Sequence, residues 1–130
     1  MSMAATGELR GKVAIVTGGS RGIGRAMSLA FAAAGAQVVI ASRTENEPPP
    51  DSPFLKYGSG TINDTARQIA QAGGEALPVS CDVTNSEDLR RLADRTVKHF
   101  GRIDIVVSNA GGDCESPVLD LEEGLLDRCL

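Results

Sequence analysis

Short apolar runs alternate along the chain with segments in which apolar residues recur at helical spacing. Residues 12–17 and 37–41 are nearly continuous apolar runs, a pattern typical of strands buried on both faces. Between them we predict an amphipathic helix that ends at Gly35. Its apolar face comprises Ile23, Met27, Ala30, Phe31 and Ala34.

The alternation continues through the rest of the chain. A second helix, stopped by Gly73 and Gly74, has an apolar face of Ile62, Ala66, Ile69 and Ala70. A third follows residues 84–87, which resemble a capping box led by Thr84, and its stripe comprises Leu89, Leu92, Ala93, Thr96, Val97 and Phe100. Strands are predicted at 75–80 and 103–108, and a last helix begins near Leu121. Pro78 places the strand at 75–80 at a sheet edge, because proline cannot donate to a ladder.

Strands separated by helices predict an α/β fold with a parallel sheet and right-handed crossovers. The chain has 130 residues, which is room for one domain of ordinary size. Residues 44–59 interrupt the alternation with Pro48, Pro49, Pro50 and Pro53. Because the alternation resumes directly afterwards, we interpret this segment as a proline-rich loop insertion within one domain spanning residues 1–130.

Composition excludes several classes of protein. The net charge is −4, but the excess of acid lies in residues 113–130, so the overall charge says little about the rest of the chain. No basic stripe indicates nucleic-acid binding. No apolar run is long enough to span a membrane, and the N-terminus lacks the apolar region of a signal peptide. Three cysteines (Cys81, Cys114 and Cys129), an odd number without zinc spacing, favour a cytoplasmic protein with neither disulfides nor a metal site.

The strongest chemical signal is the glycine-rich segment 17–24, which joins the first strand to the first helix. Gly18 allows a tight turn, Gly22 allows a pyrophosphate to approach the backbone, and Gly24 allows the helix to pack on the strand. The helix N-terminus offers N–H groups and the positive end of a dipole to phosphates. We therefore predict a dinucleotide site here; the alternative is a purely structural turn.

The residues after the second strand bear on which dinucleotide is bound. An NAD site usually carries an acid there for the ribose 2′-hydroxyl, whereas this chain has Ser42 and Arg43. Arg43 is suited to a 2′-phosphate, Ser42 to a hydrogen bond with it, and Arg21 adds positive charge. The pattern favours NADP(H) over NAD(H), and we predict that Arg43→Asp reverses the preference. The alternative is that both arginines are solvated surface charges.

Two further segments follow strands and complete the predicted cofactor site. Asp82, with Val83 beside it, is placed to accept from the adenine amino group; the alternative is a residue of the turn that enters the next helix. Asn109, Ala110 and Gly111 follow the fourth strand, at the carboxyl edge where ligands of open α/β sheets bind. Their small side chains allow a ribose and a nicotinamide to lie against the backbone.

The glycine segment 17–24, the segment 81–84 and the segment 109–111, in this order, resemble the short-chain dehydrogenase/reductase family. The resemblance covers residues 9–130. The insertion and the segment 60–66 after it resemble, more weakly, the hydroxysteroid-dehydrogenase-like branch. The resemblance implies a Rossmann-type doubly wound sheet, ordered 3-2-1-4 in this chain, and interconversion of an alcohol and a carbonyl by hydride transfer. It implies a homo-oligomer for the full-length protein and cofactor contacts at Gly18, Ser20, Arg21, Ile23, Arg43, Asp82, Val83 and Asn109. Ser108 departs from the family, which often has a second Asn there.

The catalytic residues of the family have no counterpart in the sequence. Members use an Asn, a Ser and a Tyr-x-x-x-Lys pair, whereas the only tyrosine, Tyr57, precedes Thr61 at that spacing and lies in the insertion. We interpret His99 and the pair Glu122 and Glu123 as groups that offset helix dipoles, not as catalysts. Three hypotheses stay open: the cofactor-binding portion of an NADP-dependent oxidoreductase, a non-catalytic dinucleotide-binding module, and a truncated inactive product. We also expect the apolar fourth strand, at a sheet edge, to promote aggregation.

Overall fold

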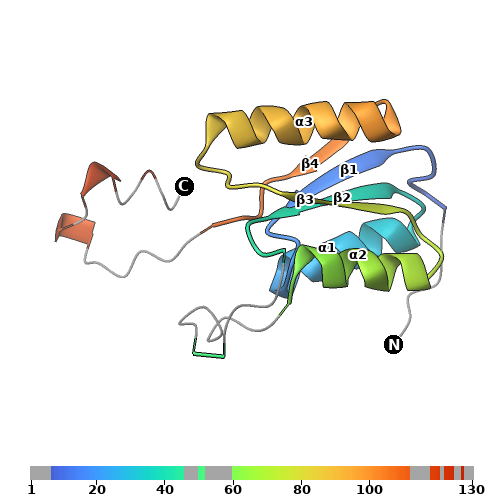
Figure 1. The fold of residues 1–130 in the computed structure, drawn as a ribbon, viewed down its shortest axis with the longest axis horizontal. Helices are drawn as coiled ribbons and strands as arrows, with labels where there is room; N and C mark the ends of the chain where they lie inside the picture. The colour runs from blue at the N-terminus through green and yellow to red at the C-terminus, as the bar shows by residue number, and fades with distance from the viewer. Residues whose placement is uncertain are drawn as a thin grey trace.

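The computed structural model describes residues 7–45, 50–51, 60–111, 118–120, 122–124 and 127. Its centre is a parallel four-stranded sheet with the order β3-β2-β1-β4 (Figure 1). The strands are β1 (Val13–Thr17), β2 (Gln37–Ser42), β3 (Ala76–Ser80) and β4 (Ile105–Val107). The predicted order 3-2-1-4 is confirmed, and so is the edge position of β3, in which Pro78 lies opposite Ile40.

Helices cover both faces of the sheet. Two of them, α1 (Gly22–Ala33) and α2 (Ile62–Gln71), lie side by side on one face, and α3 (Ser86–Phe100) lies on the other (Figure 1). A short 3-10 helix, η2, follows at Val118–Asp120. Leu121 is outside the described residues, but Glu123, Gly124 and Asp127 are helical, as expected for a helix in this region.

The sheet separates two hydrophobic clusters, because successive side chains of a strand point to opposite faces. Beneath α3 lie Ile15, Val39, Val79 and Leu92, with Phe100 packed against them. The cluster on the side of α1 and α2 contains Val16, Val38 and Ile40 of the sheet and Ile62 and Ile69 of α2, with Met27 and Phe31 of α1 packed against them. Every residue of β1 and all but the terminal residues of β2 are buried, which confirms that these two strands are covered on both faces.

The predicted helix faces are wrong at four positions. Ile23 is 74% exposed, because the first turn of α1 packs on the glycine segment through Gly24 and not on a strand. Ala70 is exposed in α2, where the buried residues are Ile62, Thr65 and Ile69. Leu89 and Val97 are also exposed, because α3 is the only helix on its face among the described residues.

Two local boundaries also differ from the prediction. The N-cap of α3 is Asn85, whose Oδ1 accepts from the N–H groups of Glu87 and Asp88, while the Thr84 hydroxyl instead donates to Asp82. A capping box led by Thr84 is therefore wrong by one residue. The fourth strand is shorter than the predicted 103–108, because at Asp104 a carboxylate oxygen replaces a backbone acceptor toward β1.

The start of the predicted insertion at 44–59 is joined to the start of α2. The N–H of Ile62 donates to the carbonyl of Thr44 at 2.9 Å, and the amide side chain of Asn63 donates to the carbonyl of Glu45 at 2.9 Å. The insertion therefore leaves and re-enters the domain at one point, beside the start of α2. Most of it, including Tyr57, lies outside the described residues.

Candidate functional site

The carboxyl ends of β1, β2 and β4 are tied together around Thr17. Its buried hydroxyl accepts from the N–H groups of Asn109 and Ala110, both at 3.0 Å, and donates to the carbonyl of Val107 at 3.2 Å. The next residue, Gly18, donates its N–H to the carbonyl of Ala41 at 2.7 Å. The glycine segment after β1 and the segment 109–111 after β4 are thereby held next to each other.

Asn109 joins these two segments through its side chain. Its Nδ2 donates to the carbonyl of Thr17 at 3.1 Å and to that of Gly18 at 3.4 Å. A Cβ at Gly18 would fall 2.8 Å from the same Nδ2, and a Cβ at Gly24 would collide with the Gly18 carbonyl. The close approach at Gly24 is therefore between helix and loop, not between helix and strand as predicted.

The N-terminus of α1 differs from those of α2 and α3. Thr61 caps α2 and Asn85 caps α3 through side-chain oxygens, and both helices carry acidic residues in the first turn. Arg21 stands at the N-cap of α1 without a side-chain cap, and the first turn contains no acid. Gly22 has a φ of +57° and open space where a Cβ would be. This end is suited to an anion, because the first N–H groups of a helix need an acceptor.

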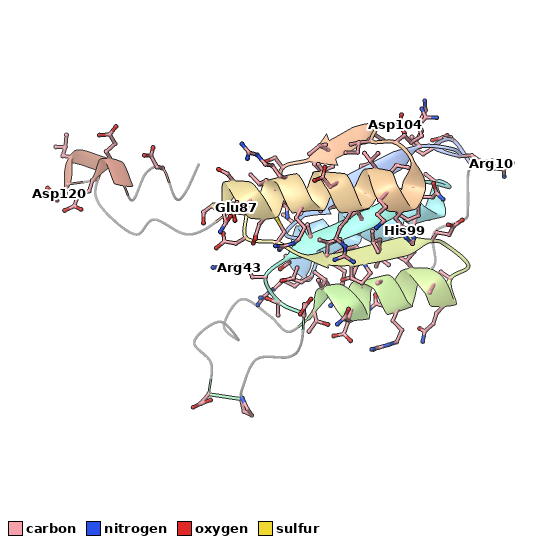
Figure 2. All side chains as sticks on the ribbon, turned by 45° about the horizontal axis from the view of Figure 1, so that its top comes forward. Arg10, Arg43, Glu87, His99, Asp104 and Asp120 are labelled. Atoms are coloured by element: carbon pink, nitrogen blue, oxygen red, sulfur yellow. The ribbon has the colours of Figure 1, made fainter. Side chains whose placement is uncertain are left out.

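The end of β2 meets the glycine segment. The Ser42 hydroxyl donates to Ser20 Oγ at 3.3 Å and accepts from the N–H of Thr44. Arg21 Nη2 donates to Thr44 Oγ1 at 3.2 Å, which brings its guanidinium to the residue after Arg43. Arg43 is exposed, and Figure 2 shows it at the end of the sheet where Glu87 and the start of α3 lie, opposite to Arg10 and Asp104. Two cations therefore stand beside β2, where an acid would suit NAD.

Asp82 lies in the turn between β3 and α3. Its Oδ1 accepts from both the N–H and the hydroxyl of Thr84, at 2.9 and 2.7 Å. These hydrogen bonds, and to a lesser extent the charge of Arg43, hold the pKa of the Asp82 carboxyl below its ordinary value. The ionised carboxylate is a hydrogen-bond acceptor, and Val83 beside it is exposed. The turn that the sequence offered as an alternative is present, and it does not exclude an adenine contact.

The remaining candidate groups are structural. Cys81 is buried, and this burial is the main cause that raises the pKa of its thiol, as expected for an inert core cysteine. His99 lies in the last turn of α3 with its ring edge-on to Phe100. The described residues contain no cluster of side chains suited to a metal ion. None of the helices in the described part of the chain is long and apolar enough to cross a membrane.

Sequence reasoning missed Arg25 and Thr65, which contact the glycine segment from α1 and α2. Thr65 Oγ1 donates to the carbonyl of Gly19 at 2.8 Å, and Arg25 donates to the carbonyl of Ser20 and to Thr65 Oγ1. One signal was available. Thr65 stands three residues after Ile62 and four before Ile69, and a threonine at a core position of a helix needs a buried partner.

Comparisons with known proteins find relatives over most of the chain. The family model described as short chain dehydrogenase matches residues 12–50 and 53–130. The human hydroxysteroid dehydrogenase-like protein 2 is 38% identical over 122 residues, which cover 94% of this chain and 28% of that protein.

Two solved structures have the same arrangement. A short chain dehydrogenase from Mycobacterium smegmatis superposes with a TM-score of 0.79 at 32% identity, over 99% of this chain and 49% of that one. A metagenomic short-chain oxidoreductase in complex with NADP has a TM-score of 0.70 at 32% identity, over 94% of this chain and 49% of that one. The chain thus spans about half the length of the structures it matches and 28% of the human relative. With its Rossmann-type sheet and its glycine segment, the chain belongs to the short-chain dehydrogenase family.

Proposed function

We propose that this chain is the cofactor-binding portion of an NADP(H)-dependent oxidoreductase that interconverts an alcohol and a carbonyl by hydride transfer. The observation that carries the proposal is the convergence of the glycine segment, the end of β2 and the segment 109–111 at one edge of the sheet. The uncapped N-terminus of α1 receives the pyrophosphate. The nicotinamide lies toward residues 109–111, and the adenine lies toward Asp82 and Val83.

The preference for NADP(H) rests on the charges beside β2. A 2′-phosphate there meets Arg43 and the guanidinium of Arg21, which Thr44 holds nearby, whereas NAD offers these cations only a hydroxyl. The related oxidoreductase in complex with NADP supports the same choice. The substrate is a small-molecule alcohol or carbonyl compound, and we expect the full-length protein to form a homo-oligomer, as the family resemblance implies.

The Arg43→Asp variant tests the cofactor preference. Wild type binds NADPH more tightly than NADH, and the substitution weakens NADPH binding about ten- to a hundredfold, because a charged hydrogen bond is replaced by repulsion. The aspartate also supplies an acceptor for the 2′-hydroxyl of NADH, so the preference reverses. Calorimetric titration of the full-length protein with both cofactors measures the two dissociation constants.

Arg10→Asp is the matched control, since it makes the same charge change at the opposite end of the sheet (Figure 2). It leaves both dissociation constants within about twofold of wild type, because surface charges more than a Debye length of about 10 Å away are screened. Equal affinities of wild type for NADPH and NADH contradict the proposed preference.

A further inference from the structure

Side chains of α1 and α2 hold the glycine segment through hydrogen bonds to its carbonyl oxygens. Thr65 Oγ1 donates to the carbonyl of Gly19 at 2.8 Å. Arg25 donates to the carbonyl of Ser20 twice, through Nε at 3.0 Å and through Nη2 at 2.6 Å. The same Nε donates to Thr65 Oγ1 at 3.1 Å, so the two side chains also hold each other.

These bonds orient the amide groups that follow. A trans peptide is planar, and its N–H points opposite to its carbonyl; the described residues contain no cis peptide. With the carbonyls of Gly19 and Ser20 turned toward Arg25 and Thr65, the N–H groups of Ser20 and Arg21 are turned the other way. Those two residues immediately precede α1, whose N-terminus is suited to an anion.

We call the contacts of Arg25 and Thr65 with the Gly19 and Ser20 carbonyls the clamp, and this region is tightly packed. Thr65 is fully buried, and Ser20 is 2% exposed. A Cβ at Gly60 would collide with the Arg25 guanidinium and with the Ser20 carbonyl. Gly60 is the last residue before the Thr61 cap of α2, so the chain enters α2 close to Arg25 and Ser20, with no room for a side chain.

Arg25 also contributes charge. In the described part of the chain its guanidinium forms no salt bridge and donates to the neutral Ser20 carbonyl and Thr65 hydroxyl. Its positive charge therefore adds to that of the α1 N-terminus.

We propose that Arg25 and Thr65 are positioning residues for the cofactor phosphates: by fixing the Gly19 and Ser20 carbonyls they preset the amides that bind the pyrophosphate. This proposal rests on the proposed function, because it assumes that a dinucleotide binds at the glycine segment. It adds a role for α2 and for the segment 60–65, which contribute no residue to the predicted cofactor contacts.

The test compares Thr65→Val with Thr96→Val in the full-length protein. Both threonines are fully buried in helices, but the Thr96 hydroxyl donates only within its own helix, to the carbonyl of Leu92 at 2.7 Å. Calorimetry with NADPH measures the dissociation constant, and thermal unfolding measures stability. We expect both variants to lose stability, while Thr65→Val alone raises the NADPH dissociation constant, about five- to tenfold, because the hydrogen bond that fixes the Gly19 carbonyl is lost.

Two further variants separate positioning from folding. Thr65→Ser keeps the hydroxyl and restores wild-type affinity. Arg25→Met removes both the two hydrogen bonds to the Ser20 carbonyl and the positive charge. It weakens NADPH binding at least as much as Thr65→Val.

The outcomes distinguish this proposal from the one it rests on. If wild type binds neither NADPH nor NADH, the proposed function is refuted, and the positioning role with it. If wild type binds NADPH and Thr65→Val binds it equally well, only the positioning role is refuted. Equal weakening by Thr65→Val and Thr96→Val also refutes it, because the effect then reflects stability alone.

Discussion

Asp104 joins the start of β1 to the segment before β4 with a single side chain. Its Oδ2 accepts from the N–H of Val13 at 2.9 Å, its own N–H donates to the carbonyl of Val13, and its Oδ1 pairs with Arg102 at 2.7 Å. The hydrogen bond from Arg102, followed by that from Val13, holds the pKa of the Asp104 carboxyl below its ordinary value. The ion pair with Arg102 needs the ionised carboxyl, and the hydrogen bond from Val13 is stronger to the ionised carboxyl than to the protonated one, so both side-chain contacts weaken in acid.

We predict that Asp104 stabilises the fold at neutral pH and ceases to do so in acid. A lowered pKa in the folded state means that the stabilisation is present above the unfolded pKa, about 3.9 for Asp, and is lost as the pH falls through the folded value. Asp104→Asn therefore unfolds at a lower urea concentration than wild type at pH 7, and the difference shrinks toward pH 3. Asp94→Asn, an exposed position in α3, is the control with little effect at either pH. A difference that is constant from pH 7 to pH 3 contradicts the assignment.

The three helices begin in two different ways. The N-termini of α2 and α3 are stabilised by capping side chains and by acidic residues in the first turn. In contrast, α1 begins with Arg21 and Gly22 and has neither a side-chain cap nor an acid in its first turn. A structural helix gains stability from its cap. A helix that binds phosphate keeps its first N–H groups available for the ligand.

For α3 we predict that Asn85, not Thr84, is the capping residue that matters. Asn85→Ala removes the acceptor for the N–H groups of Glu87 and Asp88 and lowers the free energy of unfolding by about 1 kcal/mol. Asn85→Asp keeps the acceptor and stays close to wild type. Ser86→Ala, one residue inside the helix and exposed, controls for a nearby change of side chain. Urea titrations of the three variants check the order, and a Ser86→Ala loss equal to that of Asn85→Ala overturns it.

At the scale of the molecule, one side is better covered than the other. The face beneath α1 and α2 is packed, while on the other side Leu89, Val97, Ile103 and Val106 are 36–63% exposed. Val106 lies in the middle of β4, an edge strand of the described sheet. An exposed apolar edge is a template for pairing with another strand.

We predict that the chain of 130 residues self-associates through β4, as its sequence led us to expect. Val106→Lys places a charge on the exposed face of the edge strand and lowers the sedimentation coefficient at a given concentration. Leu119→Lys is the control, since Leu119 is 98% exposed but lies in η2 and not on the sheet edge. A monomeric wild type at concentrations of tens of micromolar, or equal effects of the two lysines, contradicts the prediction.

Much of the fold and of the candidate site follows from local sequence. The strands, the helices that alternate with them and the edge position of β3 depend on periodicity and on single residues such as Pro78, whose effect does not need the rest of the molecule. The glycine segment is equally local, because a turn between a strand and a helix needs its conformational freedom at Gly18 and Gly22 wherever it occurs.

The sequence by itself determined which elements form, and it located the segments that we propose for the cofactor. The tertiary structure decided what those elements contact. Ile23 belongs to a helical stripe by spacing, yet it is exposed because Gly24 turns the first helical turn onto the loop. Thr65 lies 46 residues from Gly19 in the sequence, and Arg25 lies 40 residues from Thr65. No local pattern encodes a hydrogen bond across such separations: it exists only because the parallel sheet places α1 and α2 side by side on one face, behind the glycine segment.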